Sequence, residues 1–498
     1  MAYFSCVVQG ATLRGVEAVP VSVEVVISNG IPSFSIVGMP DAAIQESRER
    51  VRAAIRACGF VMPSDKIVVN LAPASLKKSG TGFDLPIALG LLVATNQIDH
   101  RIIAGSLVTG ELSLEGQVSA VNGLLAYEQC AKKLNCSLIT GRCDKGAVSV
   151  SGVNCYAIDR LSRIRLKDLP LMPALSSETV TVPSDFSEVG GHEMAKRALQ
   201  IAAVGEHGVL MVGPPGSGKT MLARCFPSIL PPLDESEIIE AALIRSVLGE
   251  DMSSVLAGVR PYCAPHHSAT SAGLIGGGSP VRPGEISLAH RGVLFLDELP
   301  EFRSGVLQAL RQPLEEGVVR LTRAEGLYEF PSRFLLLAAM NPCPCGYFGD
   351  PEKECRCSES QIRLYQGKIG GPLLDRIDIR IDVWRSDYAT LTSSTSGRSS
   401  AEMRDEVVEA KRFALHRTGG GNAYAKGNFK ELLEGCALRD SAGDFLHTMS
   451  NTYRMSVRSL RKVLLLSRTI ADLERSSTVE KEHVAQACAL RFKEGREA

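Results

Sequence analysis

The 498-residue sequence has no excess of charge of either sign, because 55 basic and 55 acidic residues give a formal net charge of zero. Contact with nucleic acid would therefore depend on local basic patches and not on an overall attractive field. Long apolar runs are also missing, since the longest, near residues 87–94, is much shorter than the roughly 20 residues that span a bilayer. The first residues lack a basic segment followed by an apolar run, so we expect no signal peptide. We therefore expect a cytoplasmic protein without a membrane partner.

Fourteen cysteines in such a sequence favour reduced thiols or metal ligands over a disulfide framework. Four of them form Cys-Pro-Cys, nine further residues and Cys-Arg-Cys, at Cys343, Cys345, Cys355 and Cys357. Four thiolates complete the tetrahedral set for structural Zn²⁺, although the one-residue spacers are tighter than the usual finger spacing. The alternative is four reduced surface thiols in a loop. Because an exposed cluster of free thiols is a liability, we predict zinc at this position.

The clearest motif is a glycine-rich segment that follows an apolar, strand-like run at 209–212 and precedes a helix-like run at 221–224. Its eight residues are Gly213, Pro214, Pro215, Gly216, Ser217, Gly218, Lys219 and Thr220. A strand, a glycine loop, a Lys–Thr pair and a helix form the phosphate-binding P-loop in its required context. Loop N–H groups and the helix N-terminus face the phosphates, Lys219 reaches the β- and γ-phosphates, and the Thr220 hydroxyl holds Mg²⁺. We therefore predict binding of ATP with Mg²⁺.

Two further buried strands end in polar residues suited to hydrolysis. The first, at 292–296, ends at Asp297 and Glu298, where Asp297 suits the Mg²⁺ shell and Glu298 suits the positioning of a water. The second, at 334–340, ends at Asn341, whose amide can contact the γ-phosphate or that water. An Asp–Glu pair is a weak signal alone, but here it lies 78 residues after Lys219. The sequence therefore predicts ATP hydrolysis.

Residues 1–165 alternate short strands with helices and predict an α/β domain, with strands at 21–27 and 67–72 and helices at 42–58 and 85–94. The segment resembles the catalytic domain of Lon protease, a ribosomal S5 domain 2-like fold. The resemblance lies in the strand at 67–72, the turn at 77–80, the apolar helix at 85–94 and residues 114–118. Proteases of that family use a Ser–Lys dyad, whereas this chain has Gly82 and Leu125 at the matching places. The resemblance thus implies a non-proteolytic domain for assembly or partner contact.

Segments rich in proline, serine and threonine divide the remaining chain. We predict linkers at 166–184 and 386–400, with the ATPase core at 185–385 between them. The last part, 401–498, has the character of a helical lid. Its predicted helices cover residues 401–416, 437–452, 456–473 and 480–492.

Two arginine-bearing hairpins are expected to project from the core. The first is a glycine–proline loop at 276–284 that carries Arg282, and the second pairs residues 318–323 with 327–330 and carries Arg320 and Arg323. A ring ATPase could use such hairpins to grip the phosphates of a DNA strand in its pore.

A His–His pair, His266 and His267, precedes the first hairpin. Adjacent histidines rarely face one metal ion, so we expect a structural or phosphate-sensing role for this pair.

Several of these stretches resemble the YifB/ComM family of magnesium-chelatase-like AAA+ ATPases, and the match runs nearly end to end. The motifs that carry it are 264–270, 283–292, 341–346 and 371–378. The resemblance implies a homo-hexameric ring and ATP hydrolysis stimulated by single-stranded or branched DNA. In the ComM branch it also implies helicase-type branch migration that integrates incoming DNA during natural transformation. The resemblance further assigns Asn341 to sensor 1, Arg458 to sensor 2, and Arg376 to an arginine finger that acts on a neighbouring subunit.

Two other functions stay open on sequence alone. One is a chaperone-like ATPase that remodels protein and holds clients through the Lon-like domain, and the other is a magnesium-chelatase subunit. Chain length and the fused N-terminal domain argue against the chelatase subunit. The neutral net charge separates a DNA motor from a chaperone poorly.

Overall fold

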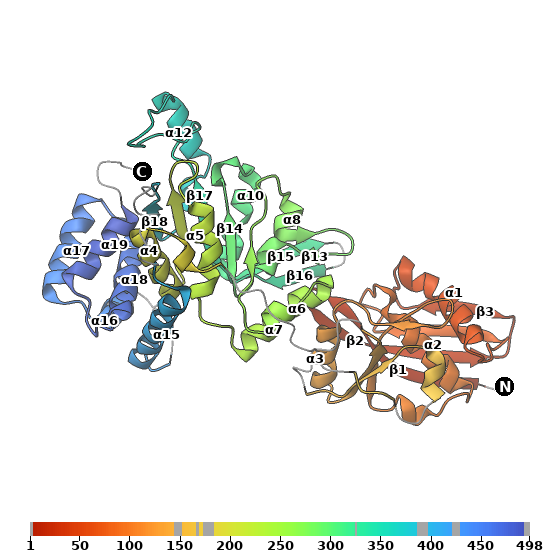
Figure 1. Ribbon diagram of the computed structural model, residues 1–498. Coiled ribbons are helices and arrows are strands. Elements are labelled where there is room, and N and C mark those ends of the chain that lie inside the picture. Colours follow the sequence, from red (N-terminus) through yellow and green to blue (C-terminus); the bar gives the residue numbers. More distant parts are fainter. Residues whose placement is uncertain are drawn as a thin grey trace.

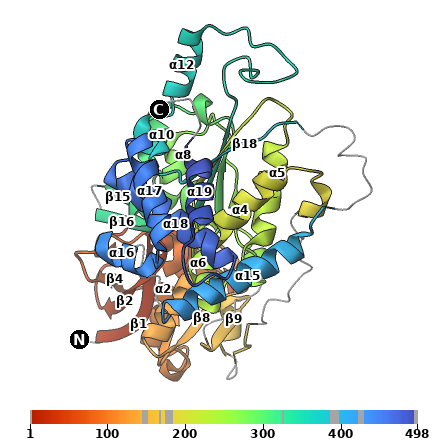
Figure 2. The same cartoon turned by 90° about the vertical axis from the view of Figure 1, so that its left-hand side faces the viewer.

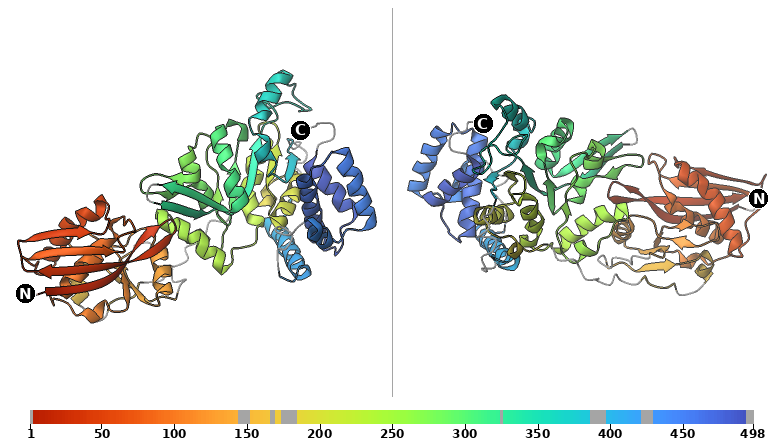
Figure 3. Two further views of the ribbon diagram at one scale, coloured as in Figure 1. Left: turned by 180° about the vertical axis from the view of Figure 1, so that it is seen from behind. Right: turned by 45° about the horizontal axis from the view of Figure 1, so that its top comes forward.

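In the computed structural model the chain folds into an N-terminal domain, a central domain and a helical lid, arranged along an elongated molecule (Figures 1 and 3). The residues that the structure describes are 3–143, 152–165, 169–172, 184–323, 326–385, 397–420 and 429–492. Most of the two predicted linkers, 166–184 and 386–400, lies outside these residues, as does the tail of the predicted lid after residue 492.

The N-terminal domain is built on a seven-stranded mixed sheet in the order β3-β4-β2-β1-β5-β8-β9. The strands are β1 (Tyr3–Arg14), β2 (Glu17–Ser28), β3 (Ser33–Val37), β4 (Lys66–Ala72), β5 (Ser106–Val108), β8 (Ser137–Gly141) and β9 (Cys155–Ile158), beside a separate pair of β6 (Glu111–Leu112) and β7 (Val118–Ser119). Helices α1 (Ala42–Ala57) and α2 (Asp84–Ala94) pack on the face that carries Val8 and Val108. Helix α3 (Leu124–Lys133) packs on the opposite face. The predicted α/β character of this domain is confirmed.

The two positions compared with the Lon dyad offer neither a nucleophile nor a base. A side chain at Gly82 would place its Cβ 2.9 Å from the Thr109 hydroxyl and 3.6 Å from that of Tyr127, so this place has no room for a serine. Leu125 is buried in an apolar cluster with Leu233 and other residues of the central domain. Both observations agree with a non-proteolytic domain, while the Lon-like fold itself stays a prediction.

Among the described residues, contacts at two places attach the N-terminal domain to the central domain. Next to α3, the Gly123 N–H donates to the Ser246 carbonyl at 2.7 Å and the Leu125 N–H donates to the Ser246 hydroxyl at 3.2 Å. The turn between β1 and β2 forms the second contact, where the Arg14 guanidinium donates to the Leu327 carbonyl at 3.4 Å. Because Leu327 belongs to the second predicted hairpin, the N-terminal domain lies directly against that hairpin.

The central domain contains five parallel strands in the order β11-β14-β17-β10-β18. They are β10 (Val209–Val212), β11 (Tyr262–Cys263), β14 (Val293–Leu296), β17 (Leu335–Met340) and β18 (Ile379–Asp382). Successive side chains of a strand point to opposite faces. Val209 and Met211 therefore join the core with α4 (Glu193–Gly205), α5 (Lys219–Cys225) and the lid, whereas Leu210 and Val212 join the core with α6 (Glu235–Leu248) and α10 (Ser304–Ala309). Parallel strands covered on both faces read as continuous apolar runs, which is why the sequence located β10, β14 and β17.

The lid lies at the end of the molecule opposite the N-terminal domain (Figure 1), and it faces the viewer in Figure 2. Its helices are α15 (Ser400–Arg417), α16 (Phe429–Cys436), α17 (Asp440–Thr452), α18 (Val457–Leu473) and α19 (Lys481–Arg491). The prediction of a helix from residue 437 was wrong by three residues, because the Arg439 N–H donates to the Val479 carbonyl and holds this segment extended. Helix α16 was not predicted. Among the described residues, no helix has the length and apolar character needed to cross a bilayer.

Candidate nucleotide site

The predicted P-loop joins the end of β10 to the start of α5. Gly216 and Gly218 adopt positive φ angles of 75° and 86°, which an L side chain rarely adopts, so both glycines are needed for the curl of the loop. Helix α5 begins at Lys219, directly after Gly218. The free N–H groups of the first helical turn and the positive end of the helix dipole therefore face the loop, as phosphate binding requires.

Lys219 is buried, and its ammonium group is held by the loop itself. Its Nζ donates to the carbonyls of Gly213 and Pro214, both at 2.9 Å, and lies 3.5 Å from the Asn341 amide oxygen. Burial lowers the pKa of Lys219, while the nearby carboxylate of Asp297 opposes this shift. A buried cation held mainly by neutral carbonyls is suited to an incoming phosphate. The structure thus places Asn341 beside the lysine of the P-loop.

Thr220 and Asp297, from different elements, meet at the other side of the loop. The Thr220 hydroxyl donates to Asp297 Oδ2 at 2.9 Å, and Asp297 Oδ1 accepts the N–H of Glu298 at 2.9 Å. A hydroxyl and a carboxylate side by side are the ligands that Mg²⁺ takes from proteins beside the phosphates of a nucleotide. These two residues therefore fit the predicted Mg²⁺.

These residues line a cavity of about 710 Å³, within the range of ordinary ligand sites. Its lining residues are Ser184, Glu188, Pro215, Gly216, Ser217, Gly218, Lys219, Thr220, Met221, Arg224, Asp297, Glu298, Met340 and Asn341. Three of the predicted catalytic residues, Asp297, Glu298 and Asn341, are among them. Ser184, Glu188 and Arg224 were missed, because their positions depend on how the chain before β10 and helix α5 pack, which no local motif shows.

Arg376 and Arg458 do not line this cavity but meet at another edge of the domain. Arg376 lies between α13 (Gly371–Leu374) and the start of β18, beside Gly208 at the start of β10. The P-loop follows the far end of β10, so the length of this four-residue strand, about 13 Å at the usual rise, separates Arg376 from the P-loop. Arg376 is therefore badly placed to reach the nucleotide of its own chain, in agreement with its predicted position.

One carboxylate, that of Glu315 in α11 (Arg311–Glu316), faces both arginines. Glu315 forms an ion pair with Arg376 and lies 3.9 Å from Arg458. Burial lowers the pKa of Arg376, and the charges of Arg458 and Arg311 lower it further. Positive charge thus exceeds negative charge at this edge, which suits the edge to a further anion. Glu315 was not singled out from sequence, because an exposed glutamate on a short helix carries no local signal.

Contacts with the lid fix the segment that carries Arg376. Asp378 lies 2.6 Å from Lys462 Nζ of α18 and 3.2 Å from His207 Nδ1. Burial raises the pKa of Asp378, but the hydrogen bonds and charges of His207 and Lys462 outweigh it and lower the pKa far below its usual value. A movement of the lid would therefore also move Arg376.

Both predicted hairpins are present. The first pairs β12 (Gly276–Gly277) with β13 (Arg282–Pro283), and the second pairs β15 (Val318–Arg323) with β16 (Gly326–Pro331). Arg320 forms ion pairs with Glu316 at the end of α11 and with Glu329 of the hairpin, so its charge is matched locally.

The other two hairpin arginines differ from Arg320. Arg282 and Arg323 are exposed, and neither forms an ion pair with a carboxylate among the residues that the structure describes. A phosphate contact is therefore better supported for Arg282 and Arg323 than for Arg320.

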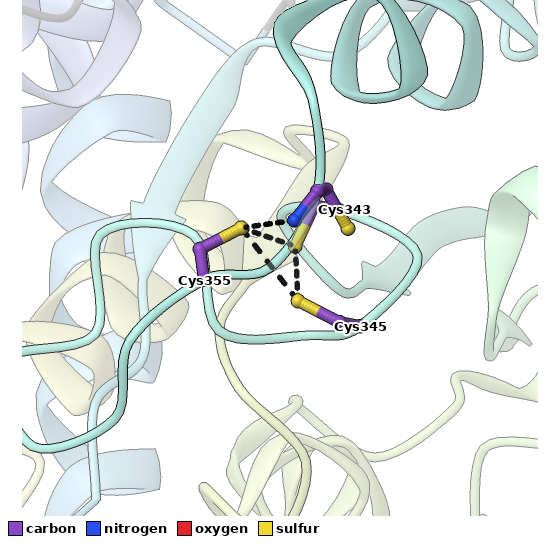
Figure 4. A group of neighbouring side chains, drawn as sticks. Cys343, Cys345 and Cys355 are labelled. Atoms are coloured by element: carbon purple, nitrogen blue, oxygen red, sulfur yellow. Dashed lines mark hydrogen bonds between the residues drawn. The ribbon is translucent and has the colours of Figure 1, made fainter.

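The four cysteines predicted to bind zinc come together in the loop after β17. The Sγ atoms of Cys343, Cys345 and Cys355 lie 3.4 to 3.6 Å apart and turn toward one another (Figure 4). With Cys357 included, all four sulfur atoms lie within 4.8 Å of one another. Tetrahedral Zn²⁺ with bonds of about 2.3 Å requires sulfur atoms about 3.8 Å apart, so the four cysteines fit zinc.

The loop that carries these cysteines, residues 341–358 between β17 and α12 (Glu359–Gly367), is called the cysteine loop and also packs against the P-loop. A Cβ at Gly346 would lie 2.6 Å from Pro215, and the Arg385 guanidinium donates to the Pro215 carbonyl at 3.3 Å. Arg385 also lies 3.9 Å from Asp350 of the cysteine loop. The loop therefore supports the P-loop from outside, and Asn341 lies just before it in the chain.

A P-loop after β10, an Asp–Glu pair after β14 with β17 between these two strands, and a helical lid define the class of AAA+ nucleotide-binding proteins. Comparison with known proteins specifies the family. Models described as "Magnesium chelatase, subunit ChlI", "Subunit ChlI of Mg-chelatase" and "Magnesium chelatase, subunit ChlI C-terminal" match residues 185–391, 23–140 and 397–491. Together with two relatives that match nearly end to end at 40% and 37% identity, these models show that the chain belongs to the YifB/ComM family of magnesium-chelatase-like AAA+ proteins.

Two relatives match nearly end to end. The chain is 40% identical over 497 residues to Competence protein ComM of Haemophilus influenzae, covering 97% of each chain. It is 37% identical over 486 residues to the uncharacterized protein YifB of Salmonella typhimurium, covering 96% of this chain and 95% of the relative.

A Magnesium-chelatase 67 kDa subunit of Chlorobaculum parvum is only 27% identical over 260 residues, covering 49% of this chain and 35% of that protein. The model matched to residues 23–140 also carries a chelatase name. We had expected the fused N-terminal domain to separate the chain from chelatase subunits. Because the model that matches this domain carries a chelatase name, the domain alone does not separate them. The chain is instead distinguished from chelatase subunits by the share of the chain that matches, which is 97% for the ComM relative and 49% for the chelatase subunit.

Proposed function

We propose that the chain is an ATP-driven DNA motor that works as a homo-hexameric ring. Its role would be branch migration during DNA recombination in natural transformation. The observation that carries the proposal is the end-to-end similarity to a competence protein, which includes the N-terminal domain and both hairpins.

The nucleotide half of the site binds and orients the reactants. The P-loop N–H groups and Lys219 bind the phosphates, and Thr220 and Asp297 hold the metal. Bound Mg²⁺-ATP supplies the phosphoanhydride bond and a cation that offsets developing charge. Glu298 accepts a hydrogen bond from the attacking water and so orients it, while Asn341 contacts the water or the γ-phosphate.

The other half of each site would come from a neighbouring subunit. A ring with heterologous contacts places one edge of each subunit against the opposite edge of the next. Arg376 and Arg458, together at the edge remote from their own P-loop, would then contact the nucleotide of the neighbour. A guanidinium there stabilises the charge of the transferring phosphoryl group. Both arginines thus act in trans in this proposal.

The hairpins would contact DNA. Arg282 and Arg323 are exposed cations without an acidic partner among the described residues, on two hairpins that lie close together. A Cβ at Gly277 of the first hairpin would lie 3.1 Å from Arg323 of the second. Such a pair can follow a phosphate backbone without reading its sequence, as a motor on DNA requires.

ATP turnover tests the proposal when it is measured with single-stranded DNA, duplex DNA, branched DNA and an unfolded protein. Single-stranded or branched DNA should raise turnover, and Glu298→Gln should abolish it in every case. If only the unfolded protein stimulates turnover, the result would favour a protein-remodelling chaperone over a DNA motor. A third function, that of a magnesium-chelatase subunit, has little support, because the match to such a subunit is short and distant.

A further inference from the structure

The His–His pair before the first hairpin contacts the predicted water-positioning carboxylate. His267 Nδ1 lies 3.3 Å from Glu298 Oε2. The His267 ring contacts the His266 ring at a centroid distance of 4.0 Å, with the two planes tilted by 35°, and lies edge-on to Phe302 at 6.5 Å. His266 is itself held by the Ser268 hydroxyl at 2.8 Å. The orientation of the His267 ring toward Glu298 is therefore fixed by its surroundings.

This contact contributes little to folding, since both partners are accessible. The side chains of His267 and Glu298 are 34% and 54% exposed, and ion pairs at such positions add little to stability. Glu298 also has a φ of 50°, in the left-handed region that a glutamate rarely adopts. Such backbone conformations gather at functional sites, where the surrounding structure holds them. The pair therefore requires a functional explanation more than a structural one.

A short, continuous segment links this pair to the hairpins. Two residues after Ser268, the Thr270 hydroxyl caps helix α8 (Ser271–Ile275) by accepting the Gly273 N–H at 3.1 Å. Helix α8 runs directly into β12, the first strand of the hairpin that carries Arg282. A displacement of the hairpins by a bound strand would thus pass through α8 to His267.

We propose that His267 is a positioning residue that restrains the Glu298 carboxylate until DNA engages the hairpins, an inference that rests on the proposed function. A carboxylate drawn toward an imidazole is held off the position from which it orients a water. Movement of α8 releases Glu298, so hydrolysis accelerates when a strand is bound. His267 thereby couples DNA binding to ATP turnover.

The experiment compares His267→Ala with wild type in DNA-free and DNA-saturated ATP turnover. We expect DNA-free turnover to rise about twofold to fivefold, the effect of losing one partly exposed imidazole–carboxylate contact. Turnover with saturating single-stranded DNA should stay unchanged, so the stimulation ratio falls by the same factor. His447→Ala, on the exposed surface of the lid, is the matched control and should leave both rates unchanged.

Two further variants separate restraint from simple structural support. His267→Asn keeps an amide donor at the place of Nδ1 and should restore the low DNA-free rate, whereas His267→Gln, whose amide reaches the place of Nε2, should behave like alanine. An unchanged or lower DNA-free rate in His267→Ala and His267→Gln, with normal thermal melting, would overturn the restraint. If no DNA stimulates wild type, the DNA motor fails, but a raised DNA-free rate in His267→Ala still supports the restraint on Glu298. An unchanged rate in that case overturns both.

Discussion

Replacement of Arg376 by alanine should spare ATP binding and block hydrolysis, because Arg376 lies at the edge of the sheet opposite the P-loop. An arginine finger accounts for about a thousandfold or more of the hydrolysis rate, so Arg376→Ala rings should be nearly inactive. Folding should be preserved, since the partner Glu315 is 52% exposed and keeps Arg458 nearby. Arg363→Ala, which removes an exposed arginine of α12 (Glu359–Gly367), is the matched control and should stay active.

The two defects should complement each other in mixed rings. We would mix Arg376→Ala subunits with Lys219→Ala subunits under different affinity tags and purify rings that carry both tags. A site is intact where an Arg376→Ala subunit, with its P-loop unaltered, receives Arg376 from a Lys219→Ala neighbour. In random one-to-one mixing this holds for about one quarter of the sites, so turnover should return to about that fraction of wild type if sites act independently. No recovery in rings shown to be mixed would mean that Arg376 acts within its own chain or only holds the fold.

Three other predictions concern the nucleotide, the cysteines and the hairpins. Lys219→Ala should lose binding of a fluorescent ATP analogue, whereas Glu298→Gln should keep it and lose phosphate release; near-normal turnover in Glu298→Gln would remove that residue from the catalytic role. Protein purified without chelator should carry about one zinc per chain, and Cys355→Ser should lose it; elemental analysis that finds no metal in wild type would refute the site. Arg282→Ala and Arg323→Ala should keep basal turnover but weaken DNA binding and lower its salt slope by about one each, and an unchanged slope would exclude a phosphate contact.

Contiguous motifs made most of the nucleotide site predictable. The P-loop residues follow one another in the chain, and their chemistry fixes their spacing. Asp297 and Asn341 could be added because the carboxyl ends of neighbouring parallel strands meet at one edge of a sheet. The apolar runs of those strands show where the ends lie.

Contacts between residues far apart in the chain could not be predicted from the sequence. His267 was noted for its neighbour His266, but its partner Glu298 follows a different strand. Glu315 faces Arg376 and Arg458 only because α11, the start of β18 and the lid pack at one edge. Such meetings depend on tertiary packing, which propensity and spacing do not encode.

Helix boundaries in the lid show the same limit. The segment before α17 has helical composition, but the backbone of Arg439 pairs with Val479, forty residues later in the chain. A backbone hydrogen bond to a distant carbonyl outweighs a weak local preference for helix. The predicted helix therefore began too early.

Branch migration on a labelled three-stranded junction tests the central claim most directly. Wild-type rings with Mg²⁺-ATP should exchange the labelled strand, and both Glu298→Gln and the omission of ATP should stop the exchange. If wild-type rings hydrolyse ATP with DNA bound but never move the junction, the result would contradict the assignment as a DNA motor.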